Sequence, residues 1–256
     1  MILFSFRKGT SWFHRLDPGS KFVWLACVSA LCLREGSAAF QGALLLAVLG
    51  FGAIAAGLSP KALWQGLRIP FWFGVPYFLL QLLALPDDGP PLFVLGPIVV
   101  SAGAFDFAAA VSLRLLTLVL ASFVWIATTD PRDAVLALAQ QLRMPYRFAY
   151  AVSIALRFLP ILEAEAEAVR AAQRLRGYGG STWRRPREKL AAWGRFGFAA
   201  FANAVRRVRQ TAETMDARGF GLHPGRTYRR TLIVPRSGLA LIVGSAAATA
   251  AVFLTA

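Results

Sequence analysis

Long apolar runs, separated by short polar stretches, dominate the pattern of this sequence. Five runs indicate α-helices that cross a bilayer, for which roughly 20 apolar residues are needed. They cover 21–33, 38–58, 70–85, 107–129 and 238–256, and the first is short enough to need its neighbours. The expected fold class is therefore an all-α integral membrane protein with about five transmembrane helices.

A further apolar stretch, residues 92–105, does not fit this pattern. It is short for a span and is interrupted by Pro97, and proline fits poorly inside a helix. We interpret the stretch as a re-entrant or interfacial segment. Four or six spans stay open as alternatives if 92–105 crosses the membrane.

Between the fourth and fifth runs, the apolar positions follow the period of amphipathic helices. Asp130 and Pro131 are typical of an N-cap and a first helical residue. Pro145 opens a second helix with a kink at Pro160, and Pro186 opens a third. The third helix carries a narrow apolar seam at Phe201, Val205, Val208, Ala212 and Met215.

The chain thus divides into three expected regions. Residues 1–129 form an N-terminal membrane region of about four transmembrane helices. Residues 130–236 form a basic block of long amphipathic helices, and residues 237–256 form a C-terminal transmembrane helix.

Charge is concentrated in the second region. The chain is 57% hydrophobic and 16% charged, with a net charge of +15, whereas soluble domains average about 45–50% and about 25%. Residues 143–236 hold 19 basic and 6 acidic side chains, a net charge of +13. Because basic segments stay on the cytoplasmic side, we expect the N-terminus and the basic block on the cytoplasmic side of the membrane and the C-terminus outside.

Few residues suggest chemistry. Cys27 and Cys32 lie about 140° apart around a helix, and the only histidines, His14 and His223, lie in different segments. The sequence therefore predicts no metal site, no cofactor and no catalytic residues, and it lacks the G-x-x-x-x-G-K-[ST] motif of ATP binding. A nucleic-acid partner is not expected, because the basic residues are spread over helices tied to membrane spans.

Two similar clusters end the long amphipathic helices. "AAQRLRG" covers 171–177 and "ETMDARGF" covers 213–220. Gly177 and Gly219 can adopt positive φ and end a helix, which leaves Arg176 and Arg218 in the last turns. There an arginine is either a solvated cation at the negative end of the helix, or a fork of donors for another protein's carboxylates and carbonyls.

These stretches resemble a known family, the transmembrane T component of energy-coupling factor transporters, which includes the cobalt-transport membrane proteins. "RLDPGSKF" (15–22), "ATTDPRDAVLAL" (127–138), "ALRFLPILEAEAEAVRAAQRLRG" (155–177) and "ETMDARGF" (213–220) occur in the family's order. The second Ala-Arg-Gly signature matches fully, whereas the first has Leu175 in place of alanine.

The resemblance implies a non-catalytic, multi-pass subunit of the bacterial inner membrane, not an enzyme. Its helices would dock on two ATP-binding-cassette ATPase subunits, and would pass their ATP-driven motion to a separate substrate-binding membrane protein, the S component. That partner would choose the cargo, a vitamin or a transition-metal ion. The implied docking residues are Leu175, Arg176, Gly177, Ala217, Arg218 and Gly219, supported by Arg174 and Phe220.

One charge inside a predicted span needs a separate interpretation. Arg114 lies in the run 107–129, where a charge costs roughly 2.5–3.5 kcal/mol. It either makes an intramembrane contact, with the substrate-binding partner or with backbone carbonyls, or extends towards the outer interface. A self-sufficient permease or channel stays open as the alternative function, although Arg114 and a few Ser, Thr and Gln are the only polar residues available to line a path.

Overall fold

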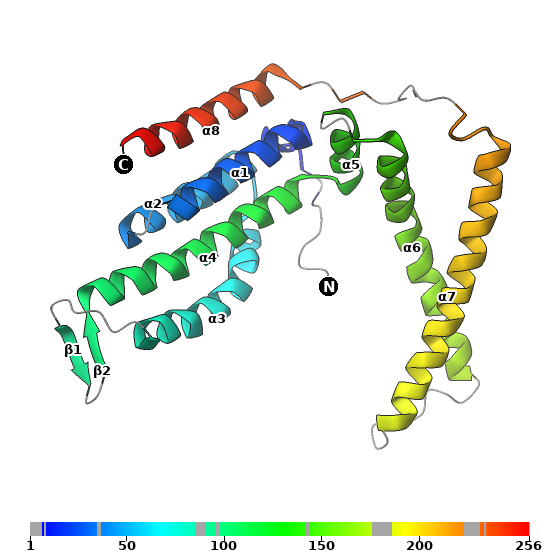
Figure 1. The fold of residues 1–256 in the computed structure, drawn as a ribbon, viewed down its shortest axis with the longest axis horizontal. Coiled ribbons are helices and arrows are strands. Elements are labelled where there is room, and N and C mark those ends of the chain that lie inside the picture. Colours follow the sequence, from blue (N-terminus) through cyan, green and yellow to red (C-terminus); the bar gives the residue numbers. More distant parts are fainter. Residues whose placement is uncertain are drawn as a thin grey trace. The chain divides into compact units, whose positions relative to one another are not determined.

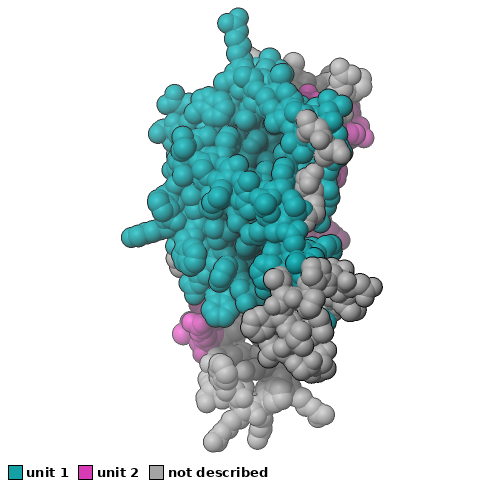
Figure 2. Space-filling model, turned by 90° about the vertical axis from the view of Figure 1, so that its left-hand side faces the viewer, with its two compact units in different colours: residues 1–137, 232–256 teal, residues 138–231 magenta. Residues whose placement is uncertain are grey.

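The chain folds into helices that form two compact units. The structure, a computed structural model, describes residues 7, 9–34, 37–84, 91–95, 98–141, 144–175, 186–222, 231, 232 and 234–255. Unit 1 comprises residues 1–137 and 232–256, and unit 2 comprises residues 138–231; they are teal and magenta in Figure 2.

Unit 1 contains five long helices, which confirms the predicted fold class. They are α1 (Pro18–Arg34), α2 (Ala38–Ile54), α3 (Pro60–Ala84), α4 (Ala102–Thr128) and α8 (Arg236–Thr255), and a 3-10 turn η1 (Phe13–Arg15) precedes α1. Among the described residues, α3, α4 and α8 are long and apolar enough to span a membrane. With 17 residues each, α1 and α2 match the lower end of the usual range of about 17–25.

Two boundaries differ from the sequence prediction. The predicted loop 59–69 is helical from Pro60, so α3 is longer than expected and contains both Pro70 and Pro76. The stretch 92–105 is not one segment: β1 (Pro91–Leu95) and β2 (Ile98–Ser101) form an antiparallel hairpin, and α4 begins at Ala102. Short runs rich in Val, Ile, Leu and Phe favour paired strands.

The five long helices alternate in direction (Figure 1). The α2 residue Ala38 donates its N–H to Asp106 near the start of α4 (3.2 Å). This contact places the starts of α2 and α4 at one end of unit 1. We call the other end the base: α1, α3 and α8 begin there, and α2 and α4 end there. Helices α1 and α8 run parallel. At their starts Gly238 lies against Asp17 and Ser20, and at their ends Phe253 stacks under the Arg34 guanidinium (4.5 Å).

The segment before α1 connects the helix ends at the base. Arg7 donates its N–H to Ala127 O of α4 (2.9 Å) and its guanidinium to Gln65 Oε1 of α3 (2.9 Å). Ser11 Oγ donates to Ala56 O, just beyond α2 (2.8 Å). Since helix ends leave carbonyls without partners in the helix, this segment supplies donors where three helices start or stop.

Lys21, in the first turn of α1, is the most buried charged side chain at the base, with 2% of its surface exposed. Its ammonium donates to Thr128 O at the end of α4 (2.8 Å) and to His14 O (3.4 Å), and it lies 5.4 Å from the centre of the Phe13 ring. A cation suits the negative end of α4. The lysine therefore joins α1 to α4 through a charge-assisted hydrogen bond.

Asp17 caps α1 beside this lysine. Its carboxylate accepts the Ser20 N–H (3.0 Å) and the Ser20 hydroxyl, which is the arrangement of an N-cap with Pro18 in the first helical position. A Cβ on Gly238 would lie 2.7 Å from Asp17 Oδ1 and 2.6 Å from Ser20 Oγ. Only glycine lets α8 approach the cap this closely.

Aromatic rings fill the space just inside the base. Trp24 of α1 stacks on Phe51 of α2 with ring centres 4.7 Å apart, and Phe13 meets both rings edge-on at 5.5 and 5.0 Å. Phe123 and Val124 of α4 are buried in the same cluster. The apolar core of unit 1 thus lies directly against its polar base.

Unit 2 is an antiparallel pair of helices, α6 (Tyr146–Leu175) and α7 (Pro186–Ala217). It follows α5 (Pro131–Gln140), whose start at Asp130 and Pro131 the sequence predicted. Glu165 of α6 forms an ion pair with Arg207 of α7, and the Arg170 guanidinium lies 5.0 Å from the Phe196 ring centre. The later residue of α6, Arg170, contacts the earlier residue of α7, Phe196, as expected for antiparallel helices.

Replacing Lys21 with methionine should destabilise unit 1. The change keeps the side-chain length but leaves the buried Thr128 carbonyl without the ammonium, a loss of about 1–3 kcal/mol. Lys61→Met, at an exposed position, should change the free energy of unfolding by less than about 0.5 kcal/mol. Unfolding of the purified protein in detergent measures both, and equal stability of the two variants would contradict this role of Lys21.

His14 should make stability depend on pH. Burial lowers its pKa below the usual 6.5, against the opposing effect of its hydrogen bond to Arg7 O. The fold therefore favours the neutral ring, so its contribution is fully present above pH 6.5 and is lost as the pH falls towards the lower folded-state pKa. Thermal unfolding between pH 7.5 and 5.5 should show this loss in wild type and a weaker one in His14→Gln; identical pH profiles would refute it.

Candidate functional site

The end of α7 has the hydrogen bonds of a Schellman motif. The Phe220 N–H bonds to Met215 O (3.0 Å), and the Gly219 N–H bonds to Asp216 O (2.9 Å). These are the crossed bonds that satisfy the last carbonyls of a helix. Ala217 is the last helical residue, so Arg218 occupies the cap position between the helix and the turn.

Gly219 makes this turn possible. Its φ is +70°, in the left-handed region that costs other residues roughly 1–2 kcal/mol. A Cβ at this position would also lie 2.7 Å from Leu222 Cδ1. The prediction that Gly219 ends the helix with a positive φ is confirmed.

The residues after the turn hold it against the start of α6. The Phe220 ring lies 4.8 Å from the Tyr150 ring centre and 6.1 Å from that of Tyr146. Arg147 donates to Gly221 O (3.4 Å). Its hydrogen bond to the Tyr146 hydroxyl raises the pKa of Arg147, although an arginine is a cation in any case. Phe220 and Gly221 therefore attach the glycine turn at the end of α7 to one patch of α6, formed by Tyr146, Arg147 and Tyr150.

Arg218 is exposed beside this anchored turn. Its backbone N–H bonds to Met215 O (3.1 Å), so its Cα is held while the guanidinium extends from the surface. A planar fork of donors on a fixed backbone is suited to carboxylates or to the carbonyls at a helix end. The arrangement can bind and orient another protein.

The first predicted cluster lies largely beyond the described residues. Helix α6 ends at Leu175, which is 91% exposed, and Arg174 before it is also exposed. Arg176 and Gly177 lie outside the described residues. The last described residues before this cluster are therefore exposed, and the roles of Arg176 and Gly177 stay a prediction.

The predicted apolar seam of α7 is only partly covered, with Val205 and Met215 half-buried. Phe201 and Val208 are 67% and 58% exposed, and Ala212 is exposed as well. Contacts to α6 include those of Arg207, of Phe196 and of Phe220 beyond the helix end. Sequence periodicity found the apolar side of α7 but could not show which side packs within the chain.

Sequence analysis also missed the receiving patch on α6. Tyr146 and Tyr150 are one helical turn apart and both contact Phe220. The signal was present, since aromatic residues four apart share a face of a helix and a phenylalanine follows the Arg-Gly pair. Their pairing spans 70 residues of sequence, which local patterns do not reveal.

Arg114 lies half-buried in α4, among the helices of unit 1. Nearby, Gln41 of α2 is fully buried and donates to Cys32 O of α1 (2.9 Å). Across the described residues, no group of three or more His, Cys, Asp or Glu side chains is placed to hold a metal ion.

Comparisons with known proteins agree over most of the chain. The family model described as cobalt transport protein matches residues 9–228. The energy-coupling factor transporter transmembrane protein EcfT of Bacillus subtilis is 29% identical over 95% of this chain and 93% of its own length. The protein of the same name from Exiguobacterium sibiricum is 32% identical over 90% of this chain and 89% of its own length.

Gly219→Ala should loosen the end of α7. The added methyl meets both the left-handed backbone and Leu222, at a cost of at least about 1–2 kcal/mol, whereas Gly197→Ala inside the same helix adds a Cβ in open space. The control should be neutral or stabilising by up to about 1 kcal/mol. Hydrogen exchange at residues 218–222 should accelerate only in Gly219→Ala, and unchanged exchange there would contradict the anchoring role of this turn.

Proposed function

This chain belongs to the cobalt transport protein family, and from that membership we propose that it is the transmembrane coupling subunit of an energy-coupling factor transporter. Two relatives that bear the name of this component align with the chain over 93% and 89% of their own length. The observation that carries the proposal is the anchored end of α7, which presents Arg218 on a fixed backbone. The chain is a membrane protein, and this end supplies it with a contact surface outside the apolar helices.

In the proposed mechanism, each Arg-Gly end enters a groove on one of two ATP-binding-cassette ATPase subunits. Arg218 with Ala217 and Gly219 forms one docking end, and Arg176 with Leu175 and Gly177 forms the other. Arg174 and Phe220 support them. Because Phe220 and Gly221 attach to Tyr150 and Arg147, force on the α7 end is transferred to the start of α6 rather than absorbed by a flexible turn.

The motion would then reach the membrane helices through the chain itself. The sequence leaves unit 1 after α4 and returns at the start of α8, and both connections lie at the base of that unit. Lys21 holds the end of α4 against α1, and Gly238 at the start of α8 lies against Asp17. ATP-driven displacement of residues 130–236 is thereby applied to three helices at once.

The remaining assignments follow from this role. The basic region 130–236 faces the cytoplasm with the N-terminus, and regions 1–129 and 237–256 form the membrane part in the bacterial inner membrane. A separate S component binds the cargo, a vitamin or a transition-metal ion such as cobalt, and docks on the membrane part. The subunit itself performs no catalysis, and Arg114 is an intramembrane contact residue.

Reversing the charge of Arg218 should uncouple the complex. The tagged chain is co-expressed with the two ATPases encoded in its own genome and purified in detergent. We expect Arg218→Glu and Arg176→Glu each to reduce ATPase recovery or cargo-linked ATP hydrolysis about tenfold or more, because a carboxylate replaces a guanidinium at the contact. The double change should abolish both.

Arg209→Glu is the matched control, since it reverses the charge of an exposed arginine on α7 away from the helix end. It should assemble like wild type. If all three variants bind the ATPases equally, the Arg-Gly ends only stop their helices. Cargo uptake by the reconstituted chain alone would instead favour a self-sufficient permease.

A further inference from the structure

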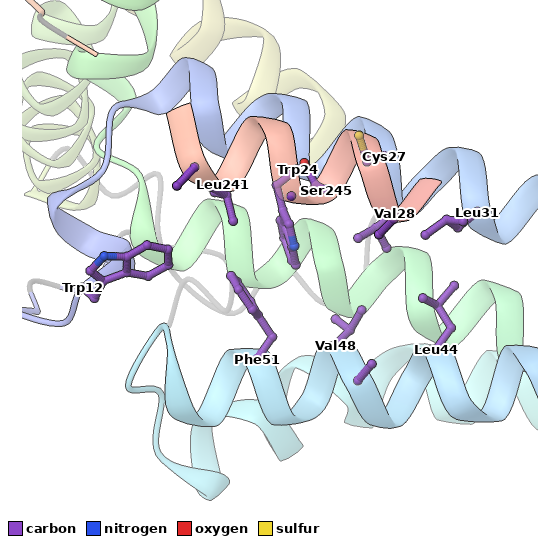
Figure 3. A pocket seen from close by; sticks show the side chains of 14 residues that line it. Trp12, Trp24, Cys27, Val28, Leu31, Leu44, Val48, Phe51, Leu241 and Ser245 are labelled. Carbon is purple, nitrogen blue, oxygen red and sulfur yellow. The ribbon is translucent and has the colours of Figure 1, made fainter. Parts of the chain in front are cut away.

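An elongated apolar cavity runs along α8 in unit 1. Its volume is about 460 Å³, and it is lined by α1, α2, α8 and Trp12. Figure 3 shows Trp12 at one end of the row of labelled side chains and Leu31 and Leu44 at the other. The α8 lining extends from Ala240 to Ala248, a length of about 12 Å at 1.5 Å per residue.

The wall of this cavity offers almost no polar contact. Trp24, Phe51 and Leu241 supply large apolar surfaces, and Gly244 leaves open space where a Cβ would meet nothing within 4 Å. The hydroxyl of Ser245 donates to Ile242 O of its own helix (3.1 Å). The wall of the cavity therefore favours an apolar occupant.

Two exposed arginines, Arg15 and Arg236, lie three and four residues from residues that line the base end of the cavity. Arg236 is exposed and lies one turn before Ala240, in the row that continues through Gly244 and Ala248; residues four apart share a helix face. Arg15 is exposed and follows Trp12 by three residues in a 3-10 turn, where such side chains eclipse.

Both arginines lie near one contact in the fold, which also contains the Asp17 carboxylate. Each is two residues from the contact between Asp17 and Gly238, where a Cβ would lie 2.7 Å from the carboxylate oxygen. Trp12, 47% exposed, stands at the same end. Tryptophan is typical of the level of lipid headgroups, and basic pockets between membrane helices bind anionic headgroups.

We propose that this cavity binds one anionic phospholipid, with an acyl chain along α8 and the phosphodiester between Arg15 and Arg236. The apolar wall matches the hydrocarbon, and the two cations match the headgroup charge. The site depends on unit 1 alone and not on the ATPase contacts.

The lipid site is tested with the purified full chain in nanodiscs that contain equal amounts of phosphatidylglycerol and phosphatidylcholine. After extraction into mild detergent, native mass spectrometry identifies the lipid retained. Each cation near a headgroup favours the anionic lipid about fivefold, so wild type should retain phosphatidylglycerol over phosphatidylcholine by roughly 25-fold.

Two variants separate the headgroup from the acyl chain. Arg15→Gln with Arg236→Gln should retain one lipid with little preference between the two headgroups, whereas the matched change Arg68→Gln, at an exposed arginine of α3, should keep the preference. Gly244→Leu places a side chain in the middle of the α8 lining, where it blocks the path of an acyl chain, and should lose both lipids. Gly50→Leu places the same side chain on α2, where a Cβ also meets nothing, outside the cavity lining, and should retain phosphatidylglycerol.

Three results would overturn the proposal. They are equal retention of both lipids by wild type, undiminished retention by Gly244→Leu, and loss of lipid in Gly50→Leu as well. A Gly244→Leu protein that keeps its lipid but loses a co-expressed membrane partner would assign the cavity to protein contact instead. Thermal unfolding of each variant confirms that it is folded before lipid is measured.

Discussion

A buried ammonium at a helix end is the interaction on which unit 1 depends. Helices α2 and α4 end at the base with carbonyls that the apolar core cannot satisfy. Lys21 and the segment before α1 bring N–H donors to them, and the lysine does so with a charge that the helix dipole favours. Because the aromatic cluster of Phe13, Trp24 and Phe51 packs directly beside this network, polar satisfaction and core packing specify the same arrangement of helix ends.

The end of α7 solves the corresponding problem in unit 2 by a different route. Its last carbonyls are satisfied by the chain turning back on itself at Gly219, and the turn is then attached to α6 through an aromatic contact. A helix stop and a docking end are therefore compatible readings of the same residues. What makes the stop suited to binding is the attachment of Phe220, because an arginine on a frayed helix end would lose more conformational entropy when it binds.

The sequence predicted those features that depend on local pattern. The apolar runs located the five long helices of unit 1 within a few residues, apart from the start of α3, where Lys61 and Arg68 break the apolar pattern although the helix continues. Pro131, Pro186 and Gly219 marked helix ends because their constraints are local. Two features depend on contacts between distant residues and could not be predicted this way: the burial of Lys21, and the choice of Tyr146 and Tyr150 as the patch that receives Phe220. The hairpin of β1 and β2 is local, but a short apolar run does not by itself distinguish a strand from a helical or interfacial segment.

The parallel packing of α8 on α1 has a consequence for how the protein is made. Residues 138–231 separate α8 from the other helices of unit 1, so a ribosome adding about 5–20 residues per second needs roughly 5–20 s to complete them. Throughout that interval the Asp17 cap and the apolar sides of α1 and α2 stand open to the bilayer. Helix α8 must then pack into a space that α1 and α2 have already formed. Gly238 has no side chain, which lets α8 approach Asp17 and Ser20 closely enough to do so.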